Sequence, residues 1–240
     1  MVLVHCASDR DGAALGVYLE RLLHFDKTAA VRLVGVGPAA AAYSGPPFGG
    51  RTVLALRLLG LQPGTAPFDV TVLAGKLLEG LSRDETELLV PDAMVGGPSW
   101  AGLLPPRAGW TRQGLIGVRD LAQEAAQGNA DFRFRALGLD RAGLDALGEE
   151  IWSRPLEAAR GFESEPESES GSGSASDDGG SASGTRLATR AALTVRTAHA
   201  AQALGFLGPD PEQSKEQALL AHIGRWLRLD APYGTVLQRD

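Results

Sequence analysis

Residues 225–239, RWLRLDAPYGTVLQR, end the chain with two short runs around a turn. In the first run, leucines alternate with Trp226 and Arg228, and the turn at 230–234 contains both Pro and Gly. Alternation with a period of two is typical of a strand with one buried face. Two such runs around a turn predict a terminal β-hairpin. We expect this hairpin to help close the core.

Two helical patterns precede the hairpin, at 185–207 and 212–223, and Pro211 stands where a helix can begin. Two helices followed by a hairpin is the element order of a winged-helix end. Its candidate nucleic-acid contacts are the arginines Arg186, Arg190, Arg196, Arg225 and Arg228. However, residues 185–240 hold seven basic and five acidic side chains, without the strong basic stripe of most DNA-binding domains. A winged-helix DNA-binding protein is therefore an alternative hypothesis, not the leading one.

The stretch before these helices, residues 161–184, is GFESEPESESGSGSASDDGGSASG. It has almost no apolar side chains, so it cannot bury enough surface to offset the entropy of ordering. We predict a disordered acidic insertion. Residues 163–178 contain six acids and no base, which equals the whole formal net charge of −6. The rest of the chain is close to neutral, so bulk charge favours neither nucleic acid nor a membrane as a partner.

The first part of the chain mixes strand and helix patterns. The periodicity predicts a helix at 11–25, where Ser8 and Asp9 can cap its start, and another at 74–81. Strands are predicted at 2–6, 31–36, 52–59 and 68–72, with a further short strand at 39–43. Helices return at 118–126 and 141–152. The fold class is therefore α+β, with a mixed part at 1–110 and a mainly helical part at 111–240 that ends in the hairpin. The two parts can also form one domain, with 161–184 as an insertion.

A loop rich in Gly, Pro and Trp spans residues 97–110. Trp100, Arg107 and Trp110 stand close together in it, and aromatic side chains beside arginine are common in binding patches. These three residues are the candidate partner-binding site. The other interpretation is that the tryptophans only pin the loop to the core.

Histidines and carboxylates form no recognisable catalytic or metal-binding pattern. The four histidines are scattered, at His5, His24, His199 and His222. The acidic clusters fit helix starts and polar surfaces, and they are Asp9 with Asp11, Asp84 with Glu85 and Glu87, and Glu149 with Glu150. A phosphate-binding glycine loop and a GxSxG motif are also missing. We expect no cofactor, no metal and no catalytic residue, although an enzyme with an unrecognised site stays open.

The composition indicates the cellular compartment of the protein. The single cysteine, Cys6, rules out an internal disulfide framework, and we expect it to be a buried thiol. The chain of 240 residues has no stretch of eighteen apolar residues and no basic start typical of a secretory signal. We therefore expect a cytoplasmic protein that does not enter a membrane. Only three of the 23 basic residues are lysines, a bias typical of a high-GC genome.

Four segments together resemble a family of uncharacterised proteins from high-GC Actinobacteria. They are GPSWAGLLPPRAGW at 97–110, IWSRP at 151–155, TAHAAQALGFL at 197–207 and GRWLRLDAPYGTVLQR at 224–239. The resemblance implies a bacterial cytoplasmic protein and assigns no functional residue. The leading hypothesis is a non-catalytic protein that binds a macromolecule, with an unidentified protein as its partner. The oligomeric state is left open.

Overall fold

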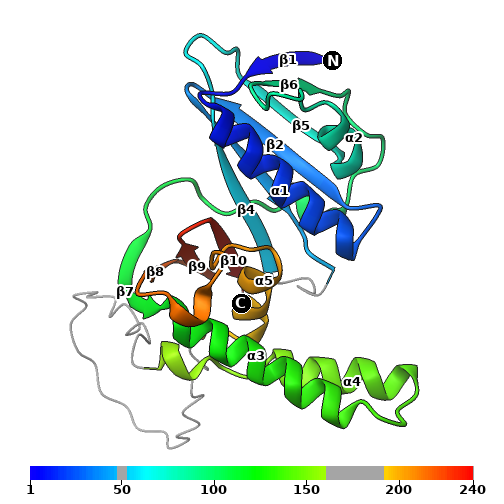
Figure 1. Cartoon of the computed structure of the whole chain (residues 1–240), viewed down its shortest axis with the longest axis vertical. Coiled ribbons are helices and arrows are strands. Elements are labelled where there is room, and N and C mark those ends of the chain that lie inside the picture. The colour runs from blue at the N-terminus through cyan, green and yellow to red at the C-terminus, as the bar shows by residue number, and fades with distance from the viewer. Residues whose placement is uncertain (48–52, 161–191, 240) are drawn as a thin grey trace, which may run out of the picture.

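The computed structural model of the chain describes residues 1–47, 53–160 and 192–239 (Figure 1). The acidic stretch predicted to be disordered, residues 161–184, lies outside the described residues. Among the helices within these ranges, we find none with the length and hydropathy of a membrane span.

An antiparallel sheet of eight strands forms the centre of the molecule, in the order β5-β2-β3-β4-β10-β9-β8-β7. Its strands are β2 Ala30–Val36, β3 Ala39–Ser44, β4 Val53–Gly60, β5 Phe68–Leu73, β7 Thr111–Gly117, β8 Gln217–Ile223, β9 Trp226–Ala231 and β10 Gly234–Arg239. A separate two-stranded sheet pairs β1 Val2–His5 with β6 Glu87–Val90. The helices are α1 Asp9–Phe25, α2 Ala74–Glu79, α3 Val118–Arg135, α4 Arg141–Trp152 and α5 Val195–Ala203. The predicted α+β class is confirmed.

Helix α1 follows from its sequence in the way predicted. The Ser8 hydroxyl accepts a hydrogen bond from the amide of Asp11 at 3.3 Å, which satisfies one of the free amides at the helix start. Leu15, Leu19 and Leu22 recur on one face and are fully buried. This face rests on the sheet, and α3 and α5 continue the same apolar layer toward the C-terminal strands.

The two faces of the sheet are covered differently. In β4, Ala55 and Leu59 belong to the large core beneath the helices, whereas Leu54 and Leu56 belong to a smaller cluster on the opposite face. The alternation follows from the two-residue period of a strand. The apolar run of β4 is covered on both faces at Val53–Leu56 but not at Leu58, which is exposed.

The terminal hairpin is confirmed, and it occupies the middle of the sheet. Strand β10 pairs with β9 on one side and with β4 on the other, in the register Val236 with Ala55. Leu229 is fully buried, while Trp226 is partly buried on the outer face. Figure 1 shows β4 reaching from the N-terminal half to the strands of the C-terminal half. The sheet is therefore continuous across both halves of the chain.

The helix predicted at 212–223 is wrong. Residues 211–213 form only a short 3-10 turn, and Gln217–Ile223 is strand β8. The run of Ala, Leu, Glu and Gln favours a helix locally, but hydrogen bonding to β7 and β9 on either side overrides that preference. Similarly, α5 begins only at Val195, and residues 185–191 of the longer helix predicted there lie outside the described residues.

The winged-helix alternative is wrong for the same reason. Its second helix is a strand, and its supposed wing, β9–β10, is hydrogen-bonded on both sides within the sheet. Neither element can enter a DNA groove in the manner of that fold.

The segments on either side of 161–191 are hydrogen-bonded to each other. The amide of Leu156 donates to the carbonyl of Leu193 at 2.8 Å, and the amide of Val195 donates to the carbonyl of Arg154 at 2.8 Å. Pro155 and Thr194 form the bridge between them. Helices α4 and α5 also pack together, because Trp152 stacks on His199 with ring centroids 4.6 Å apart.

A buried glutamine fixes the start of α5 to the sheet. The Gln238 side-chain oxygen, on β10, accepts hydrogen bonds from the Thr194 amide at 3.1 Å and from the hydroxyls of Thr194 at 3.0 Å and Thr197 at 2.6 Å. Its amide nitrogen donates to the carbonyl of Ala192 at 2.9 Å. One side chain therefore satisfies four polar groups in a largely dry region.

We expect Gln238→Leu to lower the free energy of unfolding by about 2–4 kcal/mol, because a buried polar group left unpaired costs about 1–3 kcal/mol. Urea unfolding followed by circular dichroism measures the change. The control is Gln217→Leu at the exposed start of β8, which should change the stability by less than about 0.5 kcal/mol. A loss below about 1 kcal/mol for Gln238→Leu would contradict the anchoring role.

The second prediction concerns pH. Burial, together with the nearby positive charge of Arg196, lowers the pKa of His199 to about 4. Between pH 6.5 and about 4 the unfolded chain therefore binds a proton that the folded chain does not. This contribution to stability is complete above pH 6.5 and declines as the pH falls through that range, by at most about 3 kcal/mol.

Urea unfolding at pH 7.0, 5.5 and 4.5 tests this. His199→Phe keeps an aromatic ring against Trp152 and removes the titrating group, so its stability should fall less steeply over this range. The variant His24→Gln, at an exposed position, should keep the wild-type pH dependence. Equal pH dependence in wild type and His199→Phe would show that His199 does not carry the effect.

Candidate interaction groove

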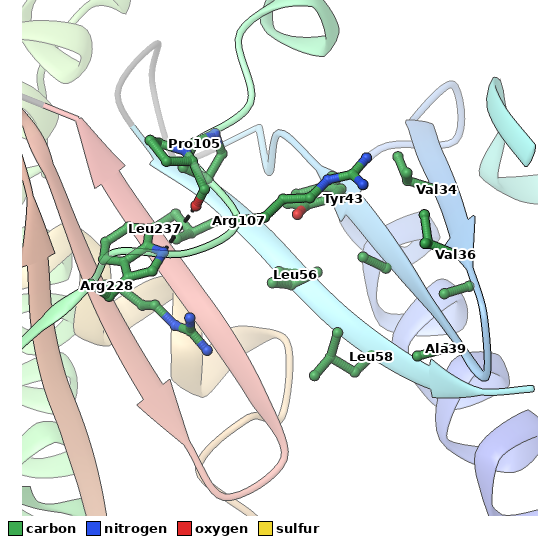
Figure 2. Close-up of a pocket in the computed structure, with 14 residues that line it drawn as sticks. Val34, Val36, Ala39, Tyr43, Leu56, Leu58, Pro105, Arg107, Arg228 and Leu237 are labelled. Carbon is green, nitrogen blue, oxygen red and sulfur yellow. Dashed lines mark hydrogen bonds between the residues drawn. The ribbon is translucent and has the colours of Figure 1, made fainter. Parts of the chain in front are cut away.

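The outer face of the sheet carries an apolar groove of about 320 Å³, between the strands β2–β4 and the loop at 105–110 (Figure 2). Its shape follows from residue size. On β3, Ala39 and Ala41 face outward. Ala39 pairs with Val36 on β2 and with Gly60 on β4, whereas Ala41 pairs with larger residues on both sides. Ala41 lies in register between Val34 and Leu58. A strand of alanines between strands of valine and leucine leaves a trough, which we call the β3 trough.

The floor of the groove exposes large apolar side chains. Val36 on β2 is 54% exposed and Leu58 on β4 is 59% exposed. Figure 2 shows both beside the trough, together with Leu56. Single exposed apolar residues are ordinary, but several that line one concave site indicate a contact surface.

The loop that forms the rim is held rigidly. The indole nitrogen of Trp110 donates to the carbonyl of Pro106 at 2.9 Å. Trp100 packs so closely on Gly45 that a Cβ there would lie 2.8 Å from its ring. Arg32 joins the loop to the sheet, because its guanidinium donates to both carboxylate oxygens of Asp69 and to the carbonyl of Ala101.

Two arginines give the groove its charge. Arg107 is exposed and extends over β4 toward Tyr43, as Figure 2 shows. Arg228, from β9, lies 5.5 Å from the ring centroid of Trp110 and donates to Asp230 at 2.8 Å. Burial raises the pKa of Tyr43, although the nearby positive charges of Arg107 and Arg228 oppose the rise. None of the described residues that line the groove is acidic.

The three residues proposed from sequence lie at this site in different ways. Arg107 and Trp110 line the groove, whereas Trp100 packs behind it, and both tryptophans are partly buried. The apolar floor of the groove was not predicted from the sequence. The run AAAAY at 39–43, whose side chains alternate between the two faces of a strand, was the feature that could have indicated it.

The proposed nucleic-acid-binding arginines do not share one surface. Arg186 and Arg190 lie outside the described residues. Arg196 is buried on α5, with its guanidinium 2.7 Å from a carboxylate oxygen of Glu149. Arg225 is exposed at the turn between β8 and β9, and Arg228 lies on the outer face of the sheet.

The lining of the groove is suited to binding rather than to catalysis. Its lining combines apolar side chains with two guanidinium groups and the Tyr43 hydroxyl, and this set lacks a pair suited to acid–base or nucleophilic catalysis.

Elsewhere, Asp11 accepts a hydrogen bond from the amide of Gly60 at 2.9 Å, a structural role. In the ranges covered by the structure, no group of three or more His, Cys, Asp or Glu side chains could hold a metal ion. Cys6 is buried, and burial raises the pKa of its thiol.

The solved structures similar to this protein include the DNA polymerase sliding clamp from Pseudomonas aeruginosa, with 11% identity over 99% of this chain and 63% of the clamp, and a TM-score of 0.48. The DNA polymerase sliding clamp from Caulobacter crescentus shows 12% identity over 95% of this chain and 63% of the clamp, with a TM-score of 0.46. The chain thus spans less than two thirds of the length of these clamps, and the likeness is too distant to bear on function. No curated protein matches the sequence.

Two sequence families match the chain. Residues 2–102 match a domain of unknown function (DUF8010), and residues 105–240 match another domain of unknown function (DUF8185). The expected resemblance to an uncharacterised family is confirmed at this level. Since the second match covers more than half of its length, the chain belongs to the DUF8185 family.

Proposed function

We propose that this protein is a non-catalytic binding protein that holds an extended segment of a partner protein in the β3 trough. The observation that carries the proposal is the exposed apolar floor formed by Val36 and Leu58 beside a fixed rim. The hydrogen bond from Trp110 to Pro106 braces the rim internally, and Arg32 ties the preceding residue Ala101 to the sheet, so a partner would lose less free energy in ordering the rim.

The groove suits an extended peptide better than a folded surface. Its floor is formed by the neighbouring strands β2, β3 and β4, whose outward side chains repeat at a two-residue spacing. Alternate side chains of an extended peptide could therefore occupy the trough and contact Leu56 and Leu58. Arg107 and Arg228 favour acidic side chains at the end of the groove near the loop.

The groove also bears on domain organisation. Its floor comes from the part at 1–110, while Arg228 and Leu237 come from the part at 111–240. We propose that these two parts act as one binding unit. We further place the protein in the cytoplasm of a high-GC actinobacterium, which its lysine-poor composition and single cysteine support.

A random peptide library displayed on phage, selected on the immobilised full-length protein, tests the proposed function. We expect selected peptides to combine alternating apolar residues with at least one acidic residue. In fluorescence anisotropy, Leu58→Asp and Arg107→Ala should each weaken binding of a selected peptide at least tenfold, since the first places a charge on the floor and the second removes one from the rim.

The matched control is Leu115→Asp, because Leu115 is also an exposed leucine on the sheet but lies on the edge strand β7. Its peptide affinity should stay within about twofold of wild type, a change of about 0.4 kcal/mol. Failure to select any peptide, or equal binding by wild type and Leu58→Asp, would overturn the proposed function.

A further inference from the structure

A second cavity, of about 420 Å³, lies on the opposite, helix-covered face of the sheet. One wall is α1, with Ala14 and Val17 facing the cavity. The other wall is the segment after α5, with Leu204 and Phe206, and Tyr233 from the β9–β10 turn lies at the edge. The cavity is therefore formed by both halves of the chain, and its volume is in the range of small-molecule sites.

The walls of this cavity are apolar and partly open to solvent. Val17 is 52% exposed and Tyr233 is 45% exposed, although both line a concave surface. Behind them, Phe206 is buried and stacks on Tyr18 with ring centroids 5.7 Å apart. This stacked pair forms the base of the cavity, and its packing in the core fixes its position.

Two arginines line the same cavity without an acidic partner. Arg57 projects from β4 on the helix-covered side and donates to the carbonyl of Tyr233. Its Nε is covered and has no hydrogen-bond partner among the described residues. Arg10, in the first turn of α1, is exposed, and within the described ranges neither arginine has a carboxylate close enough for an ion pair.

Several other arginines of the described chain hold a carboxylate. Arg32, Arg135 and Arg154 each hold a carboxylate at 2.7 Å or less. Arg57, by contrast, is half-buried, and burial lowers its pKa, with the charge of Asp11 acting in the opposite direction. A half-buried guanidinium that has only a carbonyl to hydrogen-bond gains strongly from an anion, because charge attraction is less screened there than in water.

We propose that this cavity binds an amphipathic carboxylate of medium chain length. The carboxylate would lie against Arg57 and Arg10, and the hydrocarbon chain would lie between Val17 and Leu204, over Phe206. Arginine suits a carboxylate because its planar guanidinium can donate two parallel hydrogen bonds. The apolar walls supply the rest of the affinity by removing the chain from water. The β3 trough plays no part in this site.

Isothermal titration calorimetry with decanoate, below its micellar concentration, tests the proposal on the full-length protein. The matched probe is decanol, which has the same chain length and no charge. We expect decanoate to bind at least tenfold more tightly than decanol. Raising the salt concentration should weaken the binding of decanoate and leave that of decanol nearly unchanged.

Three variants separate the contributions of charge and shape. Arg10→Ala, at an exposed position, and Arg57→Gln should each weaken decanoate binding at least fivefold without affecting decanol. Ala14→Phe keeps both arginines but fills the space beside Val17, so it should weaken both probes. Circular dichroism and urea unfolding check that each variant is folded, and because Arg10 is exposed, Arg10→Ala keeps the test valid even if Arg57→Gln does not fold.

Two further variants serve as controls. Arg83→Ala removes an exposed arginine on a polar turn away from the cavity, and Leu58→Asp alters the β3 trough. Both should bind decanoate like wild type. Equal affinity for decanoate and decanol, unchanged decanoate binding by Arg10→Ala, or no binding of either probe would overturn the proposal and would leave the peptide-binding function untouched.

Discussion

The pairing of β10 with β4 is the constraint on which the rest of the structure depends. Four residue pairs, from Thr235 with Leu56 to Gln238 with Val53, join the last strand of the chain to the N-terminal half. Strands β9, β8 and β7 follow outward from β10, so the C-terminal part of the sheet is attached through this one ladder. Both cavities lie across it. The outer groove combines β4 with residues of β9 and β10, and the inner cavity combines Arg57 of β4 with the turn that precedes β10.

Side-chain size, more than charge, gives the outer face its form. The strand β3 carries alanines on both faces, and each face uses them differently. Ala40 and Ala42 are buried in the large core on the helix-covered face, whereas Ala39 and Ala41 leave the trough on the other side. A single strand composed of small residues therefore serves tight packing inside and a hollow outside.

The sequence predicted the elements whose signals are local. Helix α1 has a capping serine and a regular apolar face, and the terminal hairpin has alternation around a Pro–Gly turn. Strand β8 was missed because Gln217–Ile223 is an apolar run without a clear period, and its neighbours β7 and β9 decide its state. The groove was found only in part. Trp110 and Arg107 are conspicuous as residue types, but the exposure of Leu58 depends on how three strands align, which no single stretch reveals.

The hydrogen-bonded pairing of Arg154–Leu156 with Leu193–Val195 has a consequence for how this family can vary. Because these two segments are hydrogen-bonded to each other, the entropic cost of closing the chain between them rises only with the logarithm of the number of residues. Adding residues to this connection should therefore change the free energy of unfolding only slightly. A reporter domain inserted into this connection should accordingly leave the hydrogen bond between Leu156 and Leu193 in place.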